Sequence, residues 1–305
     1  MKTYLDCYPC FMRQALQAAR FARIDEAGQK RILTSVMSAL ESTPDGASPP
    51  TMAREIHRLV REIGGNPDPY RAVKVSSTEH ALTWYPVLRE RIDTAADPLD
   101  MAIRLSIAGN IIDLGASAEY DLEDSIERVL SQPLAIDDTP ALRRRLGNVS
   151  RLLYLGDNSG ESVFDRLLIE TLDVPVTYAV RGAPTINDVT RQEAIEAGLE
   201  PVAEIIDNGS DAPGTLLETT STAFRERFDS AELILAKGQG NFESLSHVDA
   251  PIFFLLQAKC SVIAGELDVD EKALVVKASG PLGPDQRPCR NHQPASEPIT
   301  SARRA

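Results

Sequence analysis

Apolar residues recur with two different periods along this chain, and the change of period divides it in two. Between residues 11 and 146 they return every three or four positions, as on one face of an amphipathic helix. From residue 150 to about residue 267, short apolar runs alternate with such helical stripes. The first part predicts helices at 11–21, 29–40, 51–63, 71–92, 98–110, 122–130 and 140–146, and the second part predicts strands at 152–155, 174–180, 203–206, 231–236 and 251–257.

The alternation of strands and helices predicts an α/β fold with three α/β/α layers and a doubly wound, mostly parallel sheet. An all-helical N-terminal region, residues 1–148, precedes it and is expected to act as a lid or cap. Residues 149–277 are expected to form the metal- and phosphate-binding α/β domain. Residues 278–305 are polar and rich in proline without an apolar face, so we expect a disordered tail.

The loop after the first predicted strand carries candidate chemistry. Gly156-Asp157-Asn158-Ser159-Gly160 follows the apolar run 152–155, and Glu161 begins the next helix. Ligands of open α/β sheets bind where strands end, and adjacent carboxylate and amide oxygens suit a divalent cation. The free N–H groups of the helix N-terminus suit an anion. A simple turn with a helix cap favours the same residue types, so this loop alone leaves both interpretations open.

Two more loops strengthen the interpretation as a site. The run 174–180 leads into a loop with Arg181 and Asp188, and the run 231–236 leads into a loop with Lys237 and Asn241. Parallel strands place their carboxyl ends at one edge, so these loops are expected to converge. We expect the cation to bind Asp157, Asn158 and Asp188, and Lys237 to contact a phosphate. Arg181 suits a phosphate contact or a surface ion pair.

Several segments resemble the DUF89 family, also called the damage-control phosphatase or ARMT1-like family. They are GDNSGESVFD at 156–165, RGAPTINDVT at 181–190, AKGQGNFESL at 236–245 and DCYPC at 6–10, and the last is similar to the prokaryotic branch with an N-terminal Cys-x-x-Cys. The resemblance implies a metal-dependent phosphatase that hydrolyses small phosphorylated metabolites, such as sugar phosphates or damaged phosphometabolites. It implies metal ligands at Asp157, Asn158 and Asp188, and substrate contacts near Lys237 and the segment 110–113.

The candidate site residues follow from the loops and the resemblance together. The catalytic candidates are Asp157, Lys237, Asn110 and Asp113, and the substrate-binding candidates are Lys237, Arg181, Ser159, Glu161 and Asn241. Helix capping would also explain Asn110 and Asp113, and the helix dipole would also explain Glu161. The expected cofactor is Mn²⁺, Mg²⁺, Co²⁺ or Ni²⁺. The sequence leaves open whether water or a carboxylate such as Asp157 attacks phosphorus.

Charge and hydropathy restrict the partners. The 305 residues carry a formal net charge of −13, which argues against general nucleic-acid binding, because phosphate backbones require basic patches. No apolar run is long enough to span a bilayer, and the N-terminus lacks the layout of a signal peptide, so we expect a cytoplasmic protein that does not bind membranes. The sequence does not indicate an oligomeric state.

Cys7 and Cys10 have the spacing of a metal knuckle or a redox pair, which makes them candidates for a structural metal site or a disulfide. A zinc site would need further soft ligands, which Cys260 or a histidine would have to supply. The alternative is a pair of small apolar residues at a helix start.

Two other functions remain as alternatives to a phosphatase. A methyltransferase-like enzyme would be favoured by a Gly-x-Gly-x-x-Gly loop after the first strand, and Gly156–Gly160 does not have that pattern. A non-catalytic module that binds phosphometabolites would need the anion site without the three oxygen ligands.

Overall fold

The protein is described here from a computed structural model, which covers residues 1–109 and 120–280. The α-helices of these residues are α1 (Cys7–Phe21), α2 (Glu26–Glu41), α3 (Pro49–Gly64), α4 (Arg71–Thr94), α5 (Pro98–Gly109), α6 (Tyr120–Ser131), α7 (Thr139–Leu146), α8 (Glu161–Ile169), α9 (Arg191–Glu196), α10 (Thr222–Asp229), α11 (Gly238–Leu245) and α12 (Ser261–Leu267). The strands are β1 (Leu134–Asp137), β2 (Leu152–Leu155), β3 (Val176–Val180), β4 (Glu204–Asp207), β5 (Ile234–Lys237), β6 (Ile252–Gln257) and β7 (Leu274–Ala278).

The sheet confirms the predicted α/β architecture and locates its ligand-binding edge. Its strand order is β1-β7-β6-β5-β2-β3-β4, and every neighbouring pair is parallel except β6 and β7. The chain progresses from β2 through β3 to β4 on one side, then returns to place β5 on the other side of β2. The direction of winding therefore reverses between β2 and β5. Such a switch point leaves a crevice outside the strand ends, where ligands of open α/β sheets bind.

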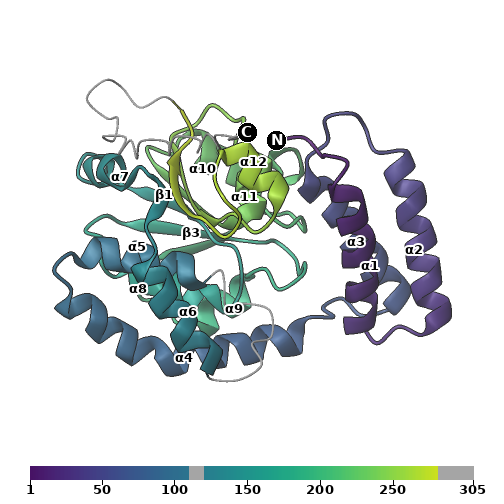
Figure 1. Ribbon diagram of the computed structural model, residues 1–305, viewed down its shortest axis with the longest axis horizontal. Helices are drawn as coiled ribbons and strands as arrows, with labels where there is room; N and C mark the ends of the chain where they lie inside the picture. Colours follow the sequence, from purple (N-terminus) through teal and green to yellow (C-terminus); the bar gives the residue numbers. More distant parts are fainter. Residues whose placement is uncertain (110–119, 281–305) are drawn as a thin grey trace, which may run out of the picture.

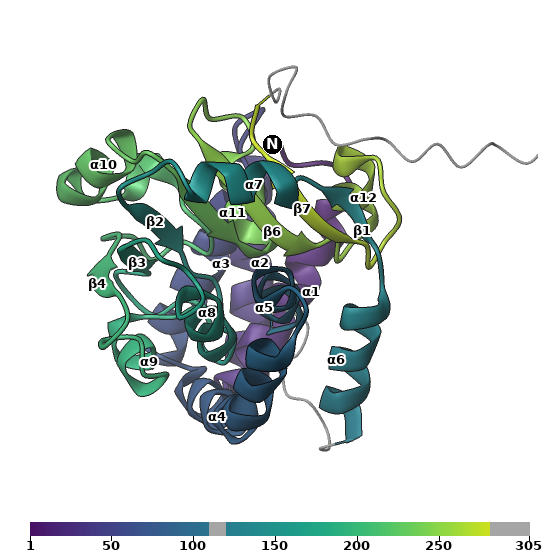
Figure 2. The same ribbon diagram turned by 90° about the vertical axis from the view of Figure 1, so that its left-hand side faces the viewer.

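Helices cover both faces of the sheet, because its central strands are apolar on both sides. All four residues of β2 and all six of β6 are buried, which is typical of a parallel sheet with two covered faces. Figures 1 and 2 show α4, α5, α8 and α9 on one face and α10, α11 and α12 on the other. Two large apolar clusters fill these two interfaces.

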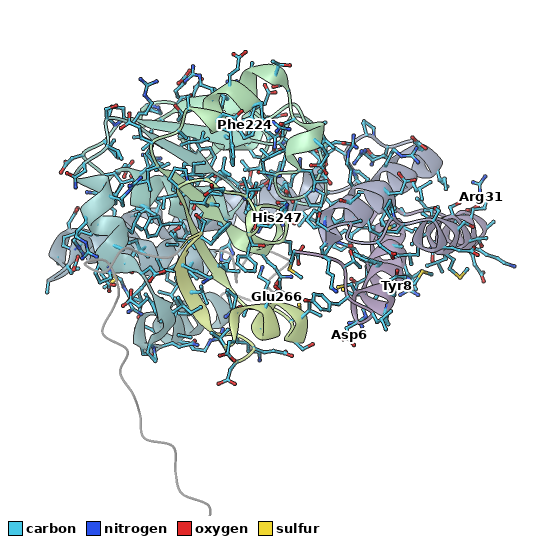
Figure 3. The ribbon with its side chains drawn as sticks, turned by 90° about the horizontal axis from the view of Figure 1, so that it is seen from above. Asp6, Tyr8, Arg31, Phe224, His247 and Glu266 are labelled. Atoms are coloured by element: carbon cyan, nitrogen blue, oxygen red, sulfur yellow. The ribbon has the colours of Figure 1, made fainter. Side chains whose placement is uncertain are left out.

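Helices α1, α2 and α3 form a separate helical unit with its own apolar cluster (Figure 1). Local sequence signals set its helix ends: Asp25 caps α2 by accepting a hydrogen bond from Gly28 N at 2.8 Å, and α3 starts with two prolines. Gly65, at a φ of +62°, ends α3 in the left-handed conformation that glycine tolerates. Seen from above in Figure 3, the unit extends to one side with Tyr8 and Arg31, whereas Phe224 lies over the sheet.

The N-terminal segment attaches the helical unit to the α/β body. The amino group of Met1 donates to Glu243 O at 2.8 Å in α11, and the hydroxyl of Tyr4 donates to Glu266 in α12. Asp6, two residues after Tyr4, is accordingly seen near Glu266 in Figure 3. The helical unit is therefore tied to the two helices that follow β5 and β6.

The sequence missed two strands. β1 lies inside the region that was expected to be all-helical, and β7 follows the last predicted strand. β1 is a four-residue edge strand in which half-buried and exposed residues alternate, and β7 has only a short apolar run. Both are stabilised by pairing with each other, a long-range contact that no local pattern reveals.

The predicted boundaries also differ from the observed packing. Helices α4, α5 and α7 contribute to the same apolar cluster as the sheet, so the core continues across the predicted boundary at residue 148. Only α1–α3 have an apolar cluster of their own, and the role of this helical region as a lid stays a prediction. Ala278 belongs to β7, and the expected disorder of the tail otherwise concerns residues 281–305, which lie outside the described residues. Within the described part of the chain, no helix combines the length and apolarity needed to cross a bilayer.

Candidate active site

The β2–α8 loop, residues 156–160, brings Asp157 and Asn158 to the switch point. β2 ends at Leu155 between β3 and β5, and the next residue, Gly156, passes close to Tyr178 on β3. A Cβ atom at Gly156 would lie 2.5 Å from the Tyr178 hydroxyl, so only glycine permits this approach. The strand end is thereby fixed with Asp157 and Asn158 directly after it.

The side chains of this loop form a hydrogen-bonded group. Asn158 Nδ2 donates to Asp157 Oδ2 at 3.1 Å and to Glu161 Oε2 at 3.0 Å. Two flanking carboxylates require the amide nitrogen between them, which fixes the orientation of the amide. Among the described residues Asn158 Oδ1 has no hydrogen-bond donor, so this oxygen remains for another ligand. Asp157 and Asn158 are each 9% exposed.

The β3–α9 loop, residues 181–190, brings Asp188 to the same place. Asn158 and Asp188 form an isolated antiparallel bridge. Val189 N donates to Asp157 O at 2.9 Å, and Ser159 uses both its backbone N and its Oγ to bind Asn187 O at 2.9 Å. The three predicted metal ligands, Asp157, Asn158 and Asp188, are therefore adjacent through the backbone of two loops.

Arg181 lies between the two aspartates and is almost completely buried. Its Nε donates to Asp188 Oδ2 at 2.7 Å, and its Nη2 lies 3.6 Å from Asp157 Oδ1. Nη2 is buried and forms no hydrogen bond to the described residues. A planar cation with a spare donor at this point suits an anionic substrate oxygen.

Lys237 has a different environment from the one predicted. It is fully buried, and its ammonium donates to Ser106 O at 2.9 Å, Glu161 Oε1 at 2.6 Å and Asp165 Oδ1 at 2.5 Å. Its three donors are therefore used beneath the site, and none is directed to a substrate. The difference arises because Asp165, one helical turn after Glu161, also faces inward, which the sequence pattern did not indicate.

Asp165 collects further donors below the site. Tyr154 and Tyr178 donate to its two oxygens at 2.7 and 2.8 Å. We call Glu161, Asp165, Lys237, Tyr154 and Tyr178 the buried network. It supports Asn158 from below through Glu161, and its members come from β2, β3, β5 and α8.

Ser159 and Asn241, two other predicted substrate contacts, are fully buried and bonded to the protein. Asn241 Nδ2 donates to Gly156 O at 3.2 Å and to Lys237 O at 2.8 Å, and its Oδ1 accepts from Thr215 at 2.7 Å. These contacts connect the loop after β2 with the end of β5, and Ser159 similarly connects the loops after β2 and β3. Both residues thus shape the site in this structure.

The site carries more buried negative charge than buried positive charge. Asp157, Glu161, Asp165 and Asp188 exceed Arg181 and Lys237 by two charges when all are ionised. Burial, with added repulsion from Glu161 and Asp188, raises the pKa of Asp157 to about 8. Burial also raises the pKa of Asp188, although Arg181 opposes the shift. A divalent cation between these oxygens would relieve that cost, so the residues present fit such a group.

Lys259 is a cation that the sequence analysis missed. It follows β6 at the same edge of the sheet, is exposed, and its charge opposes the raised pKa of Asp157. Its backbone N donates to Gln239 Oε1 at 3.3 Å, which places it beside the start of α11. The available signal was the one used for the other loops, namely a polar residue in the loop that follows an apolar strand.

Four predicted residues remain, and two of them have no described position. Asn110 and Asp113 lie outside the described residues. Cys7 is half-buried and Cys10 exposed, and both are free thiols. Within residues 1–109 and 120–280, no three His, Cys, Asp or Glu side chains are arranged to hold a metal ion. The candidate metal site accordingly depends on the amide of Asn158 beside its two carboxylates.

Comparison with known proteins agrees with this architecture. Residues 3–275 match the model of the damage-control phosphatase ARMT1-like domain, which is most of the chain. The chain belongs to this ARMT1-like family. The loops that place Asp157, Asp188, Lys237 and Lys259 all lie inside the matched region.

Individual ARMT1-like relatives cover nearly the whole chain. An uncharacterized protein of Methanocaldococcus jannaschii is 36% identical over 278 residues, which cover 87% of this chain and 91% of the relative. A damage-control phosphatase of Pyrococcus horikoshii is 36% identical over 284 residues, which cover 90% of this chain and 97% of the relative. The crystal structure of a DUF89 family protein from Pyrococcus horikoshii has a TM-score of 0.84 and 33% identity, and the match covers 92% of this chain and all of that one.

Proposed function

We propose that this protein is a metal-dependent phosphomonoesterase that hydrolyses small phosphorylated metabolites, damaged sugar phosphates among them. The observation that carries the proposal is the meeting of Asp157, Asn158 and Asp188 at the switch point, with Arg181 Nη2 beside them. The name of the Pyrococcus horikoshii relative, a damage-control phosphatase, supports the same activity.

Asp157, Asn158 and Asp188 would hold the divalent cation. Their donors are hard oxygens, which favour Mg²⁺ or Mn²⁺, and Co²⁺ or Ni²⁺ would also suit the site in vitro. When bound, the cation supplies Lewis-acid polarisation of a phosphoryl oxygen.

The chain's own cations would bind and orient the phosphate. Arg181 offers its spare Nη2 donor at the aspartates, and Lys259, an exposed residue after β6, adds a positive charge that acts on Asp157. The N-terminus of α8 points its first N–H groups to the same edge. Lys237 would act indirectly, because it holds Glu161, and Glu161 in turn holds Asn158.

The test uses purified protein freed of metal by chelation and p-nitrophenyl phosphate as the substrate. We expect no turnover without metal and recovery when Mn²⁺, Mg²⁺, Co²⁺ or Ni²⁺ is added. Asp157→Asn and Asp188→Asn should each abolish recovery and weaken Mn²⁺ binding in calorimetry. Full activity after exhaustive chelation would exclude metal dependence. Phosphate binding without turnover under every metal would instead indicate a non-catalytic binding module. A panel of sugar phosphates then ranks the substrates.

A further inference from the structure

Arg61 on α3 contacts two loops of the ligand-binding edge at once. Its Nη1 donates to Pro184 O at 3.0 Å, in the β3–α9 loop, and its Nη2 pairs with Asp211 Oδ2 at 2.6 Å, in the loop after β4. The Arg61 side chain is 17% exposed, so these contacts are largely shielded from water. Arg54, two turns earlier on α3, also pairs with Asp211. The helical unit is thus joined to the loop that carries Asp188.

The backbone between Pro184 and Asp188 is strained. Ile186 has a φ of +43°, a conformation that β-branched residues rarely adopt. Its side chain packs against the apolar cluster of α1–α3. Contacts to the helical unit on one side and to Ser159 and Asp157 on the other therefore hold this turn.

The strained turn leads directly to the candidate metal ligand. Asp188 N donates to Thr185 O at 3.0 Å, one residue after the carbonyl that Arg61 binds. A displacement at Pro184 would pass through this short turn to Asp188, because Gly182 on its other side is held by hydrogen bonds from its backbone N to Ser210 O and Asn208 Oδ1. A Cβ atom at Gly182 would lie 2.6 Å from the backbone of Gly209.

We propose that Arg61 is a positioning residue, which holds Asp188 in its metal-binding position through Pro184 and so couples the helical unit to metal affinity. This inference rests on the proposed metal site at Asp157, Asn158 and Asp188. Removal of a group that orients a metal ligand typically lowers the metal affinity 10- to 100-fold. Loss of Arg61 should accordingly weaken metal binding and leave the chemistry at saturating metal almost unchanged.

The experiment compares Arg61→Met with Arg58→Met, a matched control on the same helix. Among the described residues Arg58 pairs only with Glu55 and Glu62 of α3, so its removal leaves the loops untouched. Calorimetry of metal-free protein gives the Kd for Mn²⁺, and steady-state kinetics with p-nitrophenyl phosphate gives kcat at saturating Mn²⁺. We expect Arg61→Met to raise the Kd about tenfold, with kcat within about threefold of the wild type. Arg58→Met should change neither.

The outcomes separate this inference from the proposed function. If the wild type binds none of Mn²⁺, Mg²⁺, Co²⁺ and Ni²⁺, both are wrong. If the wild type binds Mn²⁺ and Arg61→Met has a Kd within twofold of it, the metal site stands and the role of Arg61 is refuted.

If Arg61→Met does not fold, Asp211→Asn takes its place, because it removes the ion pair of Arg61 and keeps the side-chain shape. A Kd rise for Asp211→Asn supports the inference, and an unchanged Kd overturns it.

Discussion

At the scale of single residues, the buried network shows how burial changes the role of a side chain. Burial alone would lower the pKa of Lys237, but Asp165 and Glu161 outweigh it and the pKa is raised. The ammonium is therefore charged at neutral pH and is bound by two carboxylates in the interior. Its energetic importance lies in what would remain without it, namely two buried carboxylates that have lost their cation.

The first prediction concerns this lysine. Lys237→Met is expected to lower the free energy of unfolding by about 3–5 kcal/mol, the usual cost when a buried ion pair loses one partner. Urea denaturation followed by circular dichroism measures it. The exposed Lys30 on α2 provides the control, and Lys30→Met should change stability by less than about 0.5 kcal/mol. A similar small change for Lys237→Met would show that the network does not depend on its cation.

At the scale of elements, α3 connects the helical unit to the loops that follow β3 and β4. Besides Arg54 and Arg61 it contributes His57, which is 2% exposed. His57 lines a small cavity together with Asp68, Tyr70 and Thr185, between the helical unit and the β3–α9 loop. Burial, and then the charge of Arg61, lower the pKa of His57 to about 3. The contact between the helical unit and the β3–α9 loop therefore contains a histidine that is neutral at pH 7.

This histidine makes stability depend on pH. The unfolded chain protonates His57 near its ordinary pKa of about 6.5, whereas the folded chain resists protonation down to about 3. Its stabilising contribution is thus complete above pH 6.5 and is lost as the pH falls towards 3, by about 1.4 kcal/mol per pH unit. Between pH 7 and pH 5 the wild type should lose about 2 kcal/mol more than His57→Leu.

Urea denaturation at the two pH values measures this difference. The exposed His247 serves as the control, and His247→Leu should retain most of the pH dependence of the wild type. If the free energy of unfolding has the same pH dependence in the wild type and in His57→Leu, the folded protein does not keep His57 neutral.

At the scale of the whole molecule, the C-terminal part of the described chain completes the sheet. β7 lies between β1 and β6, and Ser279 N donates to Ile252 O at 2.8 Å directly after it. A boundary at residue 278 would therefore cut into the paired strand. The composition of residues 281–305 is polar and rich in proline, which predicts little burial.

Two truncations test this boundary. A chain that ends at Gly280 is expected to keep its activity and a Tm within about 2 °C of the full chain, which corresponds to less than about 1 kcal/mol. A chain that ends at Ala273 loses β7 and is expected to be insoluble or unfolded. Differential scanning fluorimetry measures both. A Tm drop above about 5 °C for the Gly280 chain would mean that the tail stabilises the body.

The sequence by itself determined the elements and the edge at which the chemistry lies. Apolar periodicity predicted the seven N-terminal helices and five of the strands, because each such element buries a continuous local pattern. Polar loops after those strands predicted Asp157, Asn158 and Asp188 as neighbours, because parallel strands end at one edge. Their role as metal ligands stays a prediction.

Only the tertiary structure decided what each polar side chain faces. Whether Lys237 contacts a substrate or Asp165 depends on which face of α8 packs against β5. No local sequence pattern indicates which face that is. β1 and β7 exist because they pair with each other across more than a hundred residues of chain. The contact of Arg61 with Pro184 likewise joins segments that meet only when the helical unit docks on the sheet edge. Local periodicity reflects burial, whereas pairing and partner choice are properties of the packed whole.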